Sequence, residues 1–197
     1  MTILLACVEA ETAVVAADTE LAVTTAEGTT IRQCAKLFAL GGSVVLAGRG
    51  SPICLDAFVA MFSMFEGVDE IEKSFAAALA RTPKDWPAAL GPFPSDFELL
   101  MVGWSRARSA MRMMYGRRED GADFETEIRS TGSLVAPWPS EFGAMPFLGT
   151  VDALRDAAVR QCRWIKSADP SAAGGGRLIV AELERSRVTV EPHFLPA

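Results

Sequence analysis

Two charged residues stand within apolar segments, and they are the first sign of chemistry in this sequence. Lys36 lies inside the strand-like run CAKLFAL, and Asp18 ends the strand-like run TAVVAAD. A lysine in a buried strand must either extend its ammonium group to water or meet a carboxylate, because an unpaired buried charge is strongly unfavourable. We therefore expect a buried Lys36–Asp18 ion pair. A third polar residue, Thr2, directly precedes the apolar run at 3–8, so an ordered element begins at a hydroxyl group.

Several common kinds of catalytic and metal site lack the residues they need. The chain has a single histidine, His193. Its four cysteines are far apart in the sequence and form no C-x-x-C pair: Cys7, Cys34, Cys54 and Cys162. A zinc site or a serine–histidine–aspartate triad therefore has almost nothing to be built from, and we expect no metal and no cofactor. Three of the cysteines lie in apolar segments, which is typical of reduced thiols in a cytoplasmic protein.

Length and composition indicate one domain that covers residues 1–197. Half of the residues are hydrophobic and 22% are charged, which suits one sizeable core and argues against disorder. The net charge of −6 disfavours nucleic acid and anionic membranes as partners. The first residues lack the features of a signal peptide, and no apolar run approaches the ~20 residues that span a bilayer. We therefore expect a cytoplasmic protein.

Hydrophobic periodicity separates runs of strands from runs of helices. Strands are predicted at 3–8, 12–17, 20–25, 29–31, 34–40, 43–50, 97–105, 109–116, 123–130, 177–184 and 187–194. Helices are predicted at 52–66, 69–81 and from Thr150 to Ile165. Residues 134–149 are expected to form a loop, and the three glycines at 174–176 a plain turn. This order predicts an α+β fold in which helices pack outside antiparallel sheets.

Several stretches resemble the proteasome-type N-terminal-nucleophile hydrolases, and in particular a bacterial proteasome-like subunit. The segment TILLACVEAETAVVAADTE is similar to that family's first hairpin, which begins at a nucleophilic threonine and ends in alanine–alanine–aspartate. The segments AKLFAL, VVLAGRGS and LLMVGW are similar to later strands of the family. The resemblance covers most of the chain. It implies a four-layer αββα sandwich of two antiparallel sheets flanked by helices, usually assembled into ring-shaped oligomers.

The same resemblance assigns roles to six residues: Thr2 as nucleophile, Asp18 and Lys36 as its charged pair, Gly50 at the oxyanion position, Ser133 of STGS as a serine near the nucleophile, and Asp169 of SADPSAAGGG as that serine's partner aspartate. The chain also departs from the family. Thr19 and Glu20 follow the first aspartate, where the family often has an arginine or a similar residue. Alanines replace the serine and glycine that usually follow the second aspartate. No long propeptide precedes the threonine, so we expect that only removal of Met1 would free its amine.

The assigned residue types suit hydrolysis of a peptide or small amide bond. A free α-amine has a pKa of about 7.7–8.0, so the amine of Thr2 can accept the proton of its own hydroxyl. Lys36 would lower the pKa of both groups, and Asp18 would keep Lys36 charged. The backbone N–H of Gly50 would stabilise the oxyanion. We predict a homo-oligomeric threonine hydrolase that acts through Thr2 on a peptide or small amide.

The same residues are open to other interpretations. If Met1 stays in place, Thr2 is an ordinary strand residue, and the chain is a non-catalytic proteasome-like subunit that serves assembly or binding. Asp18, at the end of a hairpin, is of a type common in turns and caps. The turn GRGS at 48–51 precedes a helix and is a candidate phosphate site, although it lacks the third glycine and later acidic residue of a dinucleotide fingerprint. The methionines and phenylalanines of the helix at 52–66 exceed one face, which suggests a subunit contact.

Overall fold

The computed structural model describes residues 2–170 and 172–195, and within them it contains twelve strands and three α-helices. The strands are β1 (Leu4–Val8), β2 (Ala13–Asp18), β3 (Glu20–Thr25), β4 (Gly28–Gln33), β5 (Leu37–Leu40), β6 (Val44–Arg49), β7 (Phe97–Ser105), β8 (Ala110–Arg118), β9 (Glu125–Arg129), β10 (Gly132–Ala136), β11 (Arg177–Glu184) and β12 (Arg187–Phe194). The helices are α1 (Pro52–Phe62), α2 (Val68–Arg81) and α3 (Val151–Ala168), with short 3₁₀ turns η1 (Ala88–Leu90) and η2 (Ser140–Phe142).

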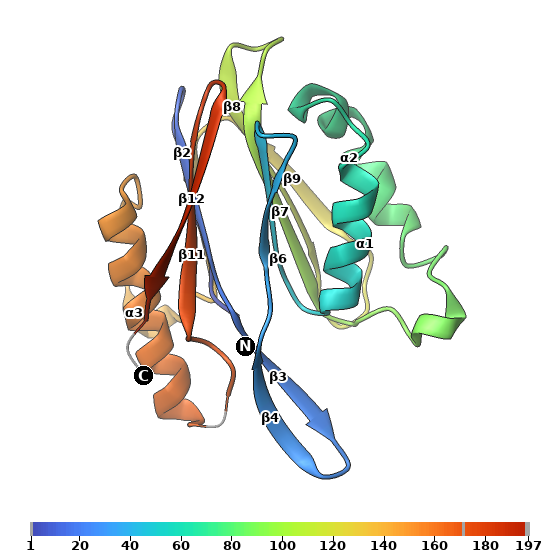
Figure 1. Ribbon diagram of the computed structural model, residues 1–197, viewed down its shortest axis with the longest axis vertical. Helices are drawn as coiled ribbons and strands as arrows, with labels where there is room; N and C mark the ends of the chain where they lie inside the picture. Colours follow the sequence, from blue (N-terminus) through green and yellow to red (C-terminus); the bar gives the residue numbers. More distant parts are fainter. Residues whose placement is uncertain (1, 171, 196–197) are drawn as a thin grey trace.

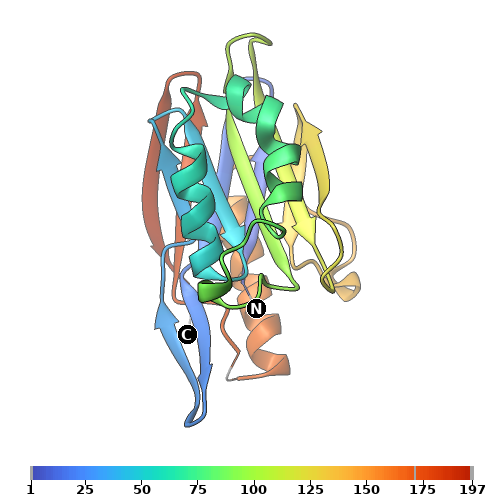
Figure 2. The same cartoon turned by 90° about the vertical axis from the view of Figure 1, so that its right-hand side faces the viewer.

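The strands of the described residues form three antiparallel sheets. The first sheet has the order β10-β1-β2-β11-β12, and the second has the order β5-β6-β7-β8-β9. Among the strands of the described residues, β3 and β4 pair only with each other, and we call this hairpin the ribbon. The ribbon extends from one end of the molecule, beyond the two larger sheets (Figures 1 and 2).

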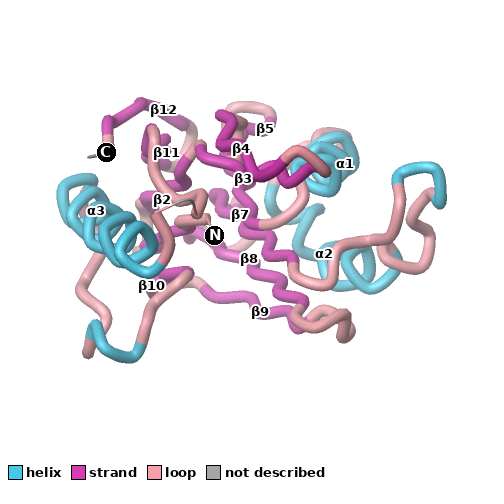
Figure 3. The backbone as a smooth tube through the Cα atoms, turned by 90° about the horizontal axis from the view of Figure 1, so that it is seen from below, coloured by secondary structure: helices cyan, strands magenta, loops and turns pink. Residues whose placement is uncertain are grey.

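Uninterrupted apolar runs become strands that are covered on both faces. In β1, Leu4 faces the core between the two large sheets, whereas Leu5 belongs to the core beneath α3. In β6, Val45 faces the core between the sheets, and Leu46 belongs to the core beneath α1 and α2. Successive side chains of a strand point to opposite faces, so these strands must be apolar throughout. Figure 3 shows α3 on one side of the sheets and α1 and α2 on the other.

The three predicted helices are confirmed, although their ends shift. α1 stops at Phe62 instead of continuing to residue 66, and α3 continues to Ala168. The hydroxyl oxygen of Thr150 accepts a hydrogen bond from the Ala153 backbone N–H at 3.2 Å, as expected for an N-cap. In α1 the side chain of Phe58 is buried, whereas Ile53 is 52% exposed. The apolar excess of this helix therefore reaches the surface.

The predicted fold class, an α+β four-layer αββα sandwich of two antiparallel sheets, is wrong. The described residues are mostly β, with twelve strands in three antiparallel sheets and only three helices. A third sheet arises because β4 is exposed along its whole length, so the ribbon has no fully apolar face to pack on either large sheet. The helices also do not cover the whole first sheet, since its edge strand β12 is largely exposed.

The segment 134–149 was expected to be a loop, and this prediction is wrong for its first residues. β10 (Gly132–Ala136) pairs with β1 over five residue pairs. Its apolar residues Leu134 and Val135 continue the two cores on either side of the first sheet. A short apolar run beside an otherwise unpaired strand edge is sufficient to form a strand, even next to a proline-rich segment.

Candidate active site

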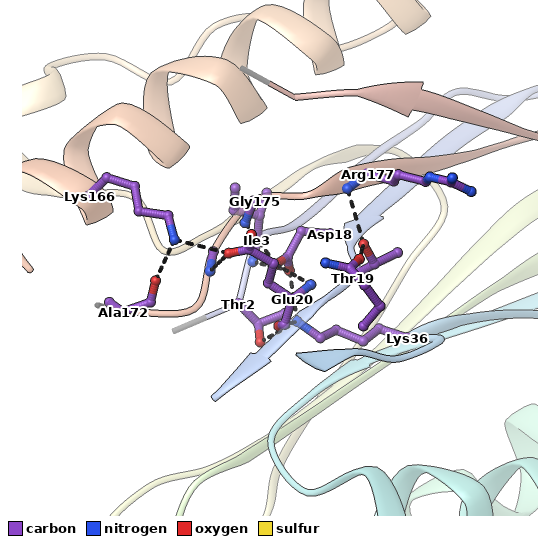
Figure 4. A network of polar contacts seen from close by, with 12 residues as sticks. Thr2, Ile3, Asp18, Thr19, Glu20, Lys36, Lys166, Ala172, Gly175 and Arg177 are labelled. Carbon is purple, nitrogen blue, oxygen red and sulfur yellow. Dashed lines mark hydrogen bonds and ion pairs between the residues drawn. The ribbon is translucent and has the colours of Figure 1, made fainter. Parts of the chain in front are cut away.

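Three polar side chains meet at the end of the molecule from which the ribbon extends (Figure 4). Thr2 lies just before β1, Asp18 ends β2, and Lys36 lies just before β5. The register of β1 and β2 places Asp18 opposite Ile3, where the Asp18 backbone N–H donates to the Ile3 carbonyl oxygen at 3.2 Å. The Lys36 backbone is fixed beside β6, because its carbonyl oxygen accepts from the Gly48 N–H at 3.0 Å. Strand pairing therefore brings all three residues together.

The Lys36 ammonium group joins these residues. Its Nζ lies 3.0 Å from Thr2 Oγ1 and 3.0 Å from Asp18 Oδ1, and it also donates to the carbonyl oxygen of Glu20. An ammonium group has three N–H donors, so each donor has an acceptor. The exposed fraction is 7% for Thr2, 0% for Asp18 and 4% for Lys36. The site thus contains a buried Lys36–Asp18 ion pair in contact with the threonine hydroxyl.

The Asp18 carboxyl group accepts hydrogen bonds on both oxygens. Besides Lys36, Oδ1 accepts from the Ile3 N–H at 2.9 Å, and Oδ2 accepts from the Gly175 N–H at 3.1 Å and the Glu20 N–H at 3.2 Å. Burial raises the pKa of Asp18, and the Lys36 charge and the backbone donors oppose that rise. The ionised carboxylate is the form that accepts all four bonds, so this environment holds it in one orientation.

A cavity of about 440 Å³ opens beside Thr2. Its lining residues are Thr2, Glu20, Leu21, Ala22, Arg49, Gly50, Asp96 and Ala173. Gly50 has a φ of +125°, and a Cβ on it would lie 2.7 Å from the Phe97 ring and 3.0 Å from the Asp96 carbonyl oxygen. A glycine is needed there on both counts. The backbone of residue 50 therefore forms part of the cavity wall near the threonine, and the volume suits a small ligand or one side chain.

No protein-family model matches this chain. No curated protein matches it either.

The site also includes Glu20, Lys166 and the loop of three glycines at 174–176, which we call the glycine loop. The sequence pattern predicted no role for any of them. Glu20 Oε2 lies 3.0 Å from Lys166 Nζ and accepts from the Gly174 N–H at 3.2 Å. The plain turn expected at 174–176 is instead a loop that donates a hydrogen bond to Asp18 through Gly175. One feature of the sequence could have indicated a role for Glu20: it is a second acidic residue only two positions after Asp18. Nothing local in the sequence indicated that α3 and its following loop would reach it.

The resemblance placed Ser133 near Thr2, the expected nucleophile. The register of β10 on β1 places it further along the sheet. Ser133 lies in β10 opposite Cys7, which is five residues after Thr2 in the sequence. At ~3.3 Å per residue, this puts Ser133 about 17 Å along the strand from the threonine. The register between β10 and β1 is set by a long-range pairing that the four-residue motif STGS does not encode.

Asp169 lies at the C-terminal cap of α3 and is exposed. Its backbone N–H donates to the Ile165 carbonyl oxygen at 3.0 Å, as a cap residue does. The loop that follows reaches the site through Ala173, which lines the cavity, and through Gly175. The segment SADPSAAGGG therefore does contribute to the site, but by backbone groups beyond the aspartate that the resemblance selected.

The remaining candidates have other environments. Arg49, in the turn at 48–51, pairs at 2.7 Å with Glu98, whose side chain is 5% exposed. Its charge is already balanced, which disfavours a phosphate site at this turn. Among the described residues, no three histidine, cysteine, aspartate or glutamate side chains are grouped closely enough to hold a metal ion. No helix in that same part of the chain has both the length and the apolar character needed to cross a membrane.

Proposed function

We propose that this protein is a threonine hydrolase that cleaves a peptide or small amide bond through Thr2, in the manner of the proteasome-type N-terminal-nucleophile hydrolases. One observation carries the proposal: Lys36 Nζ lies 3.0 Å from both Thr2 Oγ1 and Asp18 Oδ1 in a buried site. A buried ammonium group beside a hydroxyl favours the ionised oxygen, which is the nucleophilic form. The adjacent cavity supplies room for the acyl part of a substrate.

The proposed reaction uses both polar groups of Thr2. The α-amine accepts the proton of Oγ1, directly or through one water, as Oγ1 forms a bond to the substrate carbonyl carbon. The backbone N–H of Gly50 is the proposed donor to the oxyanion, and one such donor contributes about 2.7–4 kcal/mol to transition-state stabilisation. When the C–N bond breaks, the leaving amine takes the proton, and an ester to Thr2 remains. Water then hydrolyses this ester and restores the hydroxyl.

This mechanism requires that Thr2 carries a free α-amine, because an acylated nitrogen is not a base. Met1 lies outside the described residues. A mass measurement on the intact protein tests whether Met1 is removed. The intact mass of protein isolated from its native cell should be one methionine short of the full sequence. A full-length mass would instead support the alternative, a non-catalytic subunit that serves assembly or binding.

The decisive experiment is reaction with an electrophile that requires both an α-amine and a β-hydroxyl on the same residue. Protein with a free Thr2 should gain one adduct, and peptide mapping should place it on Thr2. Thr2→Val is the matched control, because it keeps the shape of this buried side chain and replaces the hydroxyl with a methyl group of similar size. Absence of an adduct on protein with a verified free amine contradicts the proposal.

Two further properties are part of the proposal. We expect a homo-oligomer, because apolar side chains at and just beyond α1 are exposed, with Ile53 52% and Met64 79% accessible. We also propose a cytoplasmic location, for which the free, mostly buried cysteines are the support. Light scattering on purified protein tests the first property, and a monomeric mass at micromolar concentration would contradict it.

A further inference from the structure

Glu20 connects three parts of the site. Its side chain is 15% exposed, and Oε2 contacts Lys166 Nζ of α3 at 3.0 Å and the Gly174 N–H at 3.2 Å. Its backbone N–H donates to Asp18 Oδ2 at 3.2 Å, and its carbonyl oxygen accepts from Lys36 Nζ. One residue therefore contacts a helix, the glycine loop and both members of the buried ion pair (Figure 4).

The glycine loop needs contacts of this kind to stay ordered. Its three glycines have φ values of +148°, +158° and +75°, and three consecutive glycines lose more backbone entropy on ordering than any other residues. The loop is held at its start by Glu20 and by Lys166 Nζ, which also donates to the Ala172 carbonyl oxygen at 2.7 Å. At its end, the Gly176 carbonyl oxygen accepts from the Leu195 N–H at 3.1 Å. Between these two contacts, the Gly175 N–H donates a hydrogen bond to Asp18 Oδ2.

We propose that Glu20 is a positioning residue: together with Lys166 it holds the loop so that Gly175 donates to Asp18, which in turn keeps Lys36 aligned with Thr2. This role rests on the proposed function of Thr2 as a nucleophile. Groups that act in a reaction must be held by further hydrogen bonds, since small displacements reduce rates strongly. Glu20 supplies such support through its side chain, whereas its backbone N–H and carbonyl oxygen, which contact Asp18 and Lys36, are still present in the alanine and glutamine variants.

The test compares Glu20→Ala and Glu20→Gln with a matched control, Glu72→Ala. Glu72 has a side chain that is 14% exposed and forms ion pairs with Arg108 and Arg112 on the second sheet's side of the molecule. The control therefore removes a carboxylate of similar burial and pairing that is not part of the site. Two quantities are measured on protein with a free Thr2 amine. One is amide hydrogen exchange at Gly175 by NMR, and the other is the saturation kinetics of acylation by the electrophile.

Glu20→Ala should speed exchange at Gly175 and lower the acylation rate at saturation, each about tenfold, which corresponds to the loss of one or two hydrogen bonds. The half-saturating concentration should change less than about twofold, because Glu20 acts through alignment of the reacting groups more than through substrate contact. Glu20→Gln should recover part of both quantities, since its amide oxygen still accepts from Gly174. Glu72→Ala should change neither quantity.

Wild-type exchange at Gly175 in Glu20→Ala would overturn the inference and leave the proposed function standing. So would an equal loss of acylation in Glu72→Ala, because the effect would then be one of general stability. Failure of the wild-type protein to react overturns the proposed function, and with it the catalytic part of the role of Glu20. In that case the exchange measurement still decides whether Glu20 holds the loop.

Discussion

Replacement of Asp18 by asparagine should strongly destabilise the protein, because it removes the counter-charge of a buried ammonium group. Lys36 Nζ lies 3.0 Å from Asp18 Oδ1, and the two side chains are 5% and 0% exposed. At that distance and an effective dielectric constant of about 20, the Coulomb attraction is about 5–6 kcal/mol before desolvation is counted. Removal of one partner of a buried pair costs about 3–5 kcal/mol in net unfolding free energy. For a chain of this length, Tm should fall by roughly 6–20 °C.

The two partners of the pair are not equivalent. Lys36→Met leaves a carboxylate that still accepts from the N–H groups of Ile3, Glu20 and Gly175. Asp18→Asn leaves an ammonium group with uncharged acceptors only. We therefore expect the lysine replacement to cost less, about 2–3 kcal/mol, because the remaining charge keeps hydrogen bonds. The double variant should cost about 2–3 kcal/mol less than the sum of the single variants.

Urea unfolding followed by tryptophan fluorescence measures these free energies for the wild type, the two single variants and the double variant. Glu11→Gln is the control, because the Glu11–Arg185 ion pair is 63% and 61% exposed and should contribute less than about 1 kcal/mol. A loss of unfolding free energy in Asp18→Asn no larger than in this control would contradict the stabilisation of Lys36 by Asp18. Single effects that add to within about 0.5 kcal/mol would contradict it as well, since two charges in direct contact must be coupled.

Three other predictions follow from local geometry. Gly50→Ala should cost about 1–3 kcal/mol of unfolding free energy and abolish acylation, because the positive φ and the 2.7 Å approach to Phe97 exclude a Cβ; an unchanged urea midpoint would contradict this. Thr150→Ala should cost about 0.5–2 kcal/mol through loss of the α3 cap, and a far smaller change would mean that water replaces the cap. The hydrogen bond from Arg112 lowers the pKa of Glu72, so the stability that Glu72 contributes is complete above its ordinary pKa of 4.5 and is lost as pH falls through the lowered value. The destabilisation by Glu72→Gln should accordingly be present at pH 7 and shrink in acid, and a pH-independent difference would argue against the shifted pKa.

Residues that break a local pattern were the predictable part of the site. Asp18 ends β2 and Lys36 directly precedes β5, and both lie in apolar stretches of the sequence. Charged side chains in such stretches must pair with each other or reach water. Their contact is present in the structure. The central strands β1, β2 and β6 were also predictable, because their apolar runs are continuous and bounded by clear turns.

Long-range register was the part that the sequence did not reveal. Glu20 and Lys166 are 146 residues apart, and no local pattern connects them. The position of Ser133 depends on how β10 aligns with β1, and a shift of a few residues would move it by more than 10 Å. The fold class was missed for a related reason: weak, polar strand signals at 20–33 gave no indication that these residues form a separate sheet.

The ribbon provides a position for a label that is remote from the site but connected to it. The chain leaves the body after Asp18 and returns to it before Lys36, so the ion pair fixes the base of the ribbon. β3 is six residues long, so at ~3.3 Å per residue the tip at 26–27 lies about 20 Å from that base. A fluorophore or a surface tether attached at that tip would be connected to Asp18 and Lys36 by the two strands of the ribbon. A label at the tip would lie outside the cavity beside Thr2, on a hairpin whose residues Leu21 and Ala22 line that cavity.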